Sequence, residues 1–314
     1  MKIVLLEGLG VSDQIIASHV KKLEEMGHTF TAYEKNTDAA VQAERCKDAD
    51  VVMIANMPLA KSAVEGAENL KFIDVAFTGV DHIPVEAAKA RGIAVSNASG
   101  YASQAVAELA ICFMIELLRK IPQTSAQCRA SGTKAGLEYR LLAGKTVGIV
   151  GCGAIGKRTA ALCKAFGATV IGYNRSKVTD PSIDEQVSLE ELLSRADVVS
   201  LHTPLTPQTK GLIGSKELGQ MKPTAYLLNT ARGGVIDQDA LAAALHKGTI
   251  AGAALDVFYE EPPLPANHPL LNTPNTLVTP HMAYDSVESM EARCEIVFNS
   301  LYSWLGGTQL NKIC

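Results

Sequence analysis

The stretch GKTVGIVGCGAIG, residues 144–156, decides the fold class of this chain. Its apolar half predicts a buried strand over Thr146–Val150. Glycines in the spacing G-x-G-x-x-G come next, and the following residues predict a helix over Ile155–Phe166 and a second strand over Thr169–Tyr173. A glycine pattern of this kind is weakly specific alone, but here it lies in the strand–turn–helix–strand frame that dinucleotide binding requires.

Each glycine of the pattern has a physical reason in a phosphate-binding turn. Gly151 permits the tight turn, Gly153 lets the backbone approach a pyrophosphate, and Gly156 permits close packing of helix on strand. The helix N-terminus at Ala154 and Ile155 offers N–H groups and the positive end of its dipole to phosphate oxygens. The stretch therefore predicts a bound dinucleotide.

The residues after the second strand bear on which dinucleotide is bound. An acidic residue there would bond to the ribose hydroxyls of NAD, but this chain has Asn174, followed by Arg175 and Ser176. Asparagine does not repel a 2′-phosphate, and the guanidinium of Arg175 can pair with that phosphate or stack on the adenine. We expect NADP, or use of both NADP and NAD; the alternative is that Arg175 is a solvated loop charge.

Short apolar runs alternate with helical stretches along the whole chain. Nearly continuous apolar strands predict a parallel sheet with helices on both faces. The sequence ADVV occurs at 49–52 and again at 196–199, each time followed by Pro-Leu, which favours two α/β domains of related doubly wound, Rossmann- or flavodoxin-like design. The alternative is that ADVV is a common way into a parallel strand. The further strands expected are Ile3–Leu6, Thr29–Tyr33, Val51–Ala55, Phe72–Val75, Ala94–Asn97, Val198–His202, Ala225–Asn229, Gly252–Asp256 and Thr276–Val278.

Composition excludes several classes of protein. The 314 residues are 47% hydrophobic and 20% charged, which is typical of about two globular domains and not of a disordered chain, a collagen or a small disulfide scaffold. Against 33 acidic residues stand 29 Lys and Arg, a net charge of −4. Because no basic stripe is present, we expect no nucleic-acid partner.

Cysteine usage and apolar runs indicate the compartment. The seven cysteines form no CxxC or Cys/His ligand spacing, so no metal site is expected, and a reducing environment is favoured. The first residues, MKIVLLEG, predict a strand and not a signal peptide. The longest apolar stretch, Ala105–Leu118, contains Glu108 and Glu116 and is too short to span a bilayer. We expect a cytoplasmic protein with no membrane partner.

Six further motifs follow one another along the chain. They are FTGVD at 77–81, NASGY at 97–101, HTPLT at 202–206, NTARGG at 229–234, LDVFYEEP at 255–262 and TPHMA at 279–283. With the glycine pattern, and in this order, they strongly resemble the D-isomer-specific 2-hydroxyacid dehydrogenases over nearly the whole length.

The resemblance implies a domain arrangement. A dinucleotide-binding domain of residues 99–282 is inserted into a substrate-binding domain made of residues 1–98 and 283–314. The last helix, Val287–Leu305, would then return to the N-terminal half. A nearly all-apolar helix from about Ala102 to Arg119 agrees with the homodimer that the resemblance implies, joined through the cofactor domains.

The resemblance also implies three catalytic residues, and their chemistry agrees with it. Arg232 would clamp a 2-keto acid, since a planar guanidinium can engage both carboxylate and carbonyl. His281 would be the general acid for reduction and the base for oxidation. Glu261, the residue before Pro262, would orient the imidazole.

Further site residues are implied by the same resemblance. The backbone N–H groups at Thr78 and Gly79 would hold the substrate carboxylate, and Tyr284 would lie at the substrate. Asp256 corresponds to the residue near the nicotinamide carboxamide, and His202 would be packing or adjacent to the cofactor. The residues assigned to the nicotinamide half or its surroundings are His202, Thr203, Pro204, Thr209, Thr230, Ala231, Asp256, His281 and Ala283.

The expected reaction is hydride transfer from NAD(P)H to a 2-keto acid, giving a D-2-hydroxy acid. Two substrate indications disagree: Tyr284 points to lactate- or branched-keto-acid-type relatives or to the corepressors, and Asn174-Arg175-Ser176 to glyoxylate or hydroxypyruvate reductases. A phosphoglycerate dehydrogenase stays open, although Val75 stands where some relatives have a basic residue. A second class of function, a dinucleotide-sensing corepressor, would keep the same fold and motifs.

Overall fold

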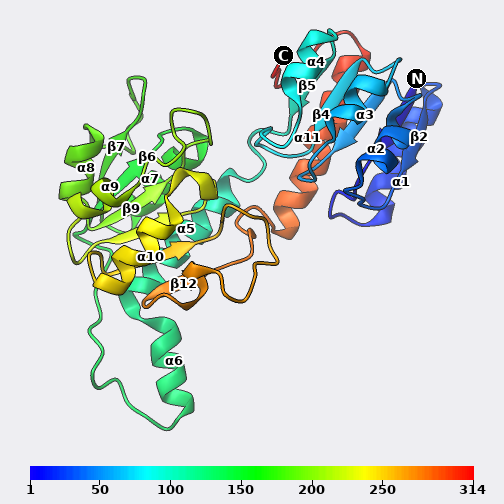
Figure 1. Ribbon diagram of the computed structural model, residues 1–314. Helices are drawn as coiled ribbons and strands as arrows, with labels where there is room; N and C mark the ends of the chain where they lie inside the picture. The colour runs from blue at the N-terminus through cyan, green and yellow to red at the C-terminus, as the bar shows by residue number, and fades with distance from the viewer. The chain divides into compact units, whose positions relative to one another are not determined.

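The computed structural model describes residues 1–314, which form two compact units (Figure 1). The first contains Met1–Ala102 and Asp285–Cys314, and the second contains Ser103–Tyr284. Each unit is a parallel sheet with helices on both faces, so the expected α/β doubly wound class is confirmed. No helix in either unit combines the length and the apolar character needed to cross a bilayer.

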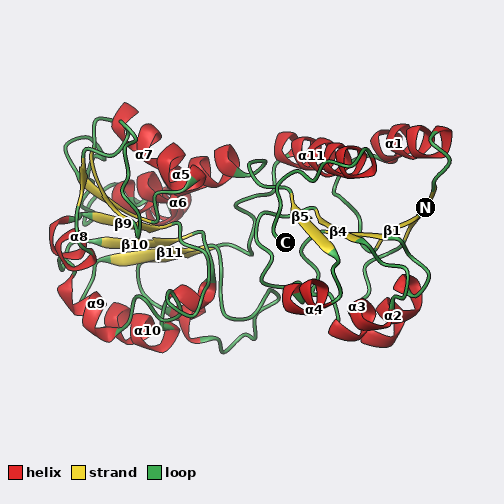
Figure 2. Cartoon of the chain, turned by 90° about the horizontal axis from the view of Figure 1, so that it is seen from above, coloured by secondary structure: helices red, strands yellow, loops and turns green.

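The first unit is built on a five-stranded parallel sheet in the order β2-β1-β3-β4-β5. Helices α1 (Asp13–Glu25) and α11 (Val287–Leu305) cover one face, and α2 (Ala39–Cys46), α3 (Lys61–Gly66) and α4 (Val85–Ala90) cover the other (Figure 2). The strands are β1 Lys2–Leu5, β2 Thr29–Ala32, β3 Val51–Ile54, β4 Phe72–Val75 and β5 Ala94–Asn97.

Chain segments far apart in sequence share the core of the first unit. Every residue of β3 and β4 is buried, as the apolar runs predicted. Helix α11 brings Phe298 into the core and stacks Trp304 on Phe72, with ring centroids 4.7 Å apart. The last residues of the chain pair with Val95, which covers the edge of β5.

The second unit has a seven-stranded parallel sheet in the order β12-β11-β10-β9-β6-β7-β8. Helices α5 (Ser103–Arg119) and α7 (Ala154–Ala165) lie on one face, and α8 (Leu189–Arg195), α9 (Ser215–Gln220) and α10 (Gln238–Lys247) on the other. The strands are β6 Thr146–Val150, β7 Thr169–Tyr173, β8 Glu185–Gln186, β9 Val198–Leu201, β10 Tyr226–Asn229, β11 Gly252–Leu255 and β12 Thr276–Val278.

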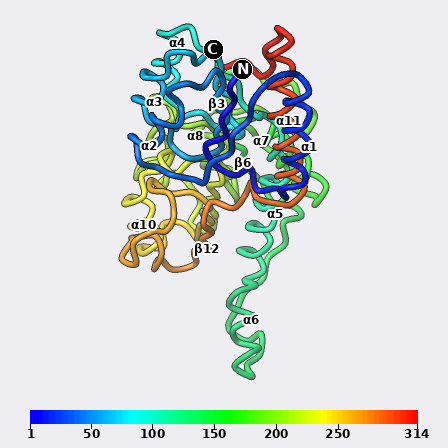
Figure 3. The backbone as a smooth tube through the Cα atoms, turned by 90° about the vertical axis from the view of Figure 1, so that its right-hand side faces the viewer, coloured from blue at the N-terminus to red at the C-terminus, as the bar shows by residue number.

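Two features of the second unit differ from a simple apolar pattern. Strand β8 has two exposed residues and was not expected, because it depends on pairing with β7 and not on burial. Helix α6 (Ile121–Arg129) projects from the unit and buries none of its residues (Figure 3).

Each sheet has one topological switch point, where successive strands leave in opposite directions. It lies between β1 and β3 in the first sheet and between β6 and β9 in the second. In doubly wound sheets, ligands bind outside the carboxyl ends of the strands at such points. These two edges are therefore the places in which to look for a site.

Candidate functional site

The glycine turn lies at the switch point of the second sheet. Gly151 follows β6 with a φ of 96°, and a Cβ atom on it would lie 2.7 Å from the carbonyl oxygen of His202, which follows β9. A Cβ atom on Gly156 would overlap the carbonyl oxygen of Gly151. Both positions therefore exclude any side chain, and this lets α7 begin directly against the end of β6.

The N-terminus of α7 is open. Its N-cap residue is Gly153, no side chain caps the helix, and a Cβ atom on Gly153 would have nothing within 4 Å. The first N–H groups of the helix have no intrahelical partner, and they carry the positive end of the helix dipole. An anion such as a pyrophosphate fits this arrangement.

Two buried hydroxyls at the same edge have no partner in the protein. Thr203 follows β9 and Thr230 follows β10, and the Oγ1 atom of each is buried without a hydrogen bond. Buried polar groups are nearly always satisfied, so each hydroxyl indicates a ligand or a water molecule beside it. The residues present therefore fit a dinucleotide that lies along the ends of β6, β9 and β10.

Asn174 organises the loop after β7. Its Oδ1 accepts a hydrogen bond from the N–H of Cys152 at 3.2 Å, and its Nδ2 donates to the backbone oxygen and hydroxyl of Ser176. Gln186 of β8 donates to the backbone oxygens of Asn174 and Ser176, a brace that sequence reasoning missed because β8 was not expected. Arg175 and Ser176 are exposed.

The segment after β9 is held by its own side chains. Burial lowers the pKa of His202 to about 4, so this imidazole is neutral at physiological pH. Its Nε2 lies 2.9 Å from the hydroxyl of Ser200. Further along, the hydroxyl of Thr209 donates to the carbonyl of Pro204 at 2.6 Å. This places Thr209 as a brace of the turn that carries Pro204.

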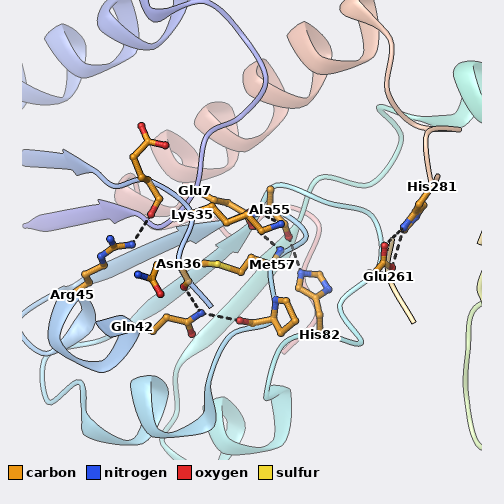
Figure 4. Close-up of polar contacts among 12 residues, drawn as sticks. Glu7, Lys35, Asn36, Gln42, Arg45, Ala55, Met57, His82, Glu261 and His281 are labelled. Atoms are coloured by element: carbon orange, nitrogen blue, oxygen red, sulfur yellow. Dashed lines mark hydrogen bonds and ion pairs between the residues drawn. The ribbon is translucent and has the colours of Figure 1, made fainter. Parts of the chain in front are cut away.

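His281 and Glu261 are in direct contact. Nδ1 of His281 lies 2.8 and 3.0 Å from the two carboxylate oxygens of Glu261 (Figure 4). The Tyr284 ring meets the imidazole edge to face, with centroids 5.4 Å apart. The His281 side chain is 11% exposed and that of Glu261 is 70% exposed, so the pair lies at a surface that solutes can reach.

A buried carboxylate fixes the turn that carries His281. Asp256 is fully buried, and its carboxylate accepts hydrogen bonds from the hydroxyl of Thr279 and from the N–H groups of Met282 and Ala283, at 2.6 to 2.9 Å. Its carbonyl accepts the N–H of His281, whose φ of 57° lies in the left-handed region. Such a conformation persists only where the surroundings enforce it. Sequence reasoning missed this role of Asp256, because it depends on β11 and β12 meeting.

Arg232 follows β10 at the same edge. Asn229 holds this turn: its Nδ2 donates to the carbonyl of Arg232 and its Oδ1 accepts the N–H of Ala231. Arg232 Nη1 donates to the carbonyl of Ala231 at 2.8 Å. Because β10, β11 and β12 are neighbours, Arg232, Asp256 and the His281 turn all follow adjacent strand ends.

Thr78 and Gly79 belong to the first unit. They follow β4, and Nδ2 of Asn97 donates to the carbonyl of Thr78 at 2.6 Å. Asn97, at the end of β5, is therefore a further residue that positions this loop. Its motif, NASGY, was the only signal for it in the sequence.

The chain matches known proteins over its whole length. Residues 111–283 match the family model for the D-isomer specific 2-hydroxyacid dehydrogenase, NAD binding domain. A hydroxypyruvate reductase of Blautia hydrogenotrophica is 32% identical over 100% of this chain and 99% of that protein. A D-3-phosphoglycerate dehydrogenase of Methanocaldococcus jannaschii is 38% identical over 95% of this chain, which spans only 57% of that relative.

Solved structures agree. The acyclic imino acid reductase Bsp5, in complex with NADPH and D-Arg, superposes with a TM-score of 0.92 at 30% identity, covering 100% of both chains. Fold, sequence and the conserved order of motifs point the same way. This chain belongs to the D-isomer specific 2-hydroxyacid dehydrogenase family.

Proposed function

We propose that the protein reduces a 2-keto acid to a D-2-hydroxy acid with a reduced nicotinamide dinucleotide, and catalyses the reverse reaction. The observation that carries this proposal is the His281–Glu261 pair on a turn fixed by Asp256. When bound, the reduced nicotinamide supplies a hydride to C2 of the keto acid.

In this proposal His281 exchanges the proton. Because Nδ1 faces the Glu261 carboxylate, Nε2 is the atom that gives a proton to the oxygen on C2, and takes it back during oxidation. Glu261 orients the imidazole and stabilises its charged form. The Asp256 clamp keeps the ring in place during both directions of the reaction.

Arg232 binds the other end of the reacting group. Its guanidinium can engage the carboxylate and the C2 oxygen together, and so favours the developing negative charge. Asn229 positions the backbone of Arg232 for this role. In the first unit, the N–H groups of Thr78 and Gly79 are proposed to bind the substrate carboxylate.

The dinucleotide is proposed to lie along the ends of β6, β9 and β10, with NADP used alone or together with NAD. Asn174 carries no charge to repel a 2′-phosphate, and exposed Arg175 can pair with one. The relative Bsp5, 30% identical, binds NADPH. Thr203 and Thr230 would gain partners in the bound state.

The assay is oxidation of NADPH and NADH against a panel of keto acids. It contains glyoxylate, hydroxypyruvate, pyruvate, 2-ketoisocaproate, phenylpyruvate and phosphohydroxypyruvate. We expect fastest turnover with hydroxypyruvate or glyoxylate, in line with the hydroxypyruvate reductase relative. Dinucleotide binding without turnover of any keto acid would overturn the proposal.

A homodimer through the second unit is also proposed. Helix α6 buries none of its residues within the chain, and Ile121 and Leu141 beside it are 44% and 64% exposed. An extended arm of this kind favours contact with a second copy. Light scattering should give twice the chain mass, and a monomer mass would contradict the proposal.

A further inference from the structure

A buried acid lies at the switch point of the first sheet. Glu7 follows β1 and is only 4% exposed. Its Oε1 accepts the N–H groups of Ala55 and Met57, at 2.9 and 2.7 Å, and so holds the loop that follows β3 (Figure 4). Nε2 of His82 lies 2.7 Å from the carbonyl of Ala55 and supports the same loop from the other side.

The nearby cations are already engaged. Nζ of Lys35, in the loop after β2, lies 3.8 Å from Oε2 of Glu7, and its side chain is 56% exposed. Arg45 donates to the carbonyl of Glu34 at 2.7 Å and lies over the ring of Tyr33. The Glu7 carboxylate therefore cancels the charge of Lys35 at this edge.

The strand order works as a ruler along the edge. Lys35, Glu7, Asn56 and Thr78 follow β2, β1, β3 and β4, which are successive neighbours in the sheet. Neighbouring strands are about 4.8 Å apart. With a substrate carboxylate at Thr78, a substituent on C3 reaches the end of β3, and a phosphate on that substituent extends toward Glu7.

We propose that the Glu7–Lys35 pair is a specificity determinant that admits 2-keto acids with an uncharged C3 substituent and rejects those with a second anionic group. The inference rests on the proposed function. A second anion would meet the buried Glu7 carboxylate and a lysine whose charge is already compensated, and like charges placed together are a common means of rejecting a wrong ligand.

The test compares kcat/KM for hydroxypyruvate with that for phosphohydroxypyruvate. The wild-type protein should prefer hydroxypyruvate by about 100-fold, from the cost of placing like charges together. Glu7→Gln keeps an oxygen for the two backbone donors and frees the charge of Lys35, so the preference should fall by about tenfold. Adding Lys35→Gln to that variant should restore the wild-type preference.

A second variant acts in the opposite direction and does not depend on the buried site. Lys35→Gln alone removes an exposed cation, so Glu7 stays without a counter-charge and the preference for hydroxypyruvate should rise about threefold. This variant tests the proposal even if Glu7→Gln folds poorly.

A matched control exists at the opposite edge of the same sheet. Asp50 precedes β3, accepts the N–H of Lys2 at 2.8 Å and pairs with Lys71 at 2.8 Å. Asp50→Asn removes the same charge from a similar arrangement, and should leave the substrate preference unchanged.

The outcomes separate this inference from the proposed function. Equal or better use of phosphohydroxypyruvate by the wild-type protein would overturn the inference, as would an unchanged preference in both Lys35→Gln and a folded Glu7→Gln. If the wild-type protein reduces no keto acid at all, the proposed function fails instead.

Discussion

The carboxyl edges of the two sheets share a topology and differ in what they present. At the switch point of the second sheet, glycines, helix N–H groups and two unpaired threonine hydroxyls face outward. At that of the first sheet, a buried acid and a lysine form an ion pair. A backbone-built edge suits a constant ligand such as a pyrophosphate, whereas charged side chains can be exchanged to choose among substrates.

The largest effect is expected at Arg232, where the second sheet departs from its backbone-built pattern. Arg232→Lys keeps the charge but loses the planar fork, so kcat/KM for the keto acid should fall about 100-fold. Steady-state kinetics measures this, with dinucleotide affinity as the internal reference. Arg195→Lys, on an exposed arginine paired with Glu185 and Glu191, is the matched control and should be silent. An equally active Arg232→Lys enzyme would contradict the assigned role.

The glycine turn should fail as soon as any side chain enters it. Gly151→Ala brings a methyl group against the His202 carbonyl, so dinucleotide affinity should fall by about 30-fold or more. Gly144→Ala is the matched control, because Gly144 also has a positive φ, at 74°, yet a Cβ atom there meets nothing. Calorimetric titration of both variants separates overlap from backbone strain; equal losses would mean that strain alone explains the effect.

A smaller change is expected in the choice of dinucleotide. Asn174→Asp places a negative charge where a 2′-phosphate would bind, so the ratio of kcat/KM for NADPH to that for NADH should fall about tenfold. Arg175→Ala should move the same ratio in the same direction by less. If neither substitution alters the ratio, this loop does not read the 2′ position.

The smallest effect concerns an acid within the first sheet. Burial raises the pKa of Asp74, in β4, well above its ordinary 3.8, and Ser300 of α11 is its hydrogen-bond partner. Between the two pKa values the folded state keeps a proton that the unfolded state has released, so stability falls as pH rises through that window. Asp74→Asn should raise Tm by about 3 °C at pH 8 and by less at pH 4. Equal shifts at both pH values would contradict the protonated carboxyl.

Sequence predicted those parts that depend on local pattern. The apolar run before Gly151 gave β6, the glycine spacing gave α7, and the expected last helix, Val287–Leu305, has those bounds in the structure. The strands β3 and β10 are likewise confirmed within a residue or two of the expected ends.

What sequence did not reveal depends on contacts between distant segments. Strand β8 exists because Gln186 pairs with β7 and braces the Asn174 loop. The Asp256 clamp needs β11 and β12 to lie side by side. The Glu7–Lys35 pair needs β1 and β2 to end together. In each case a polar side chain gains its role only when two strand ends meet, and no spacing along the chain signals that.

The most direct test of the account is turnover of hydroxypyruvate by His281→Ala, with the configuration of the wild-type product determined by chiral chromatography. The wild-type protein should give D-glycerate. The variant should bind the dinucleotide as well as wild type and lose about 1000-fold in kcat, since proton transfer by a positioned side chain contributes on that order. A variant with wild-type turnover, or an L product, would contradict the central claim that His281, held by Glu261 and Asp256, delivers the proton.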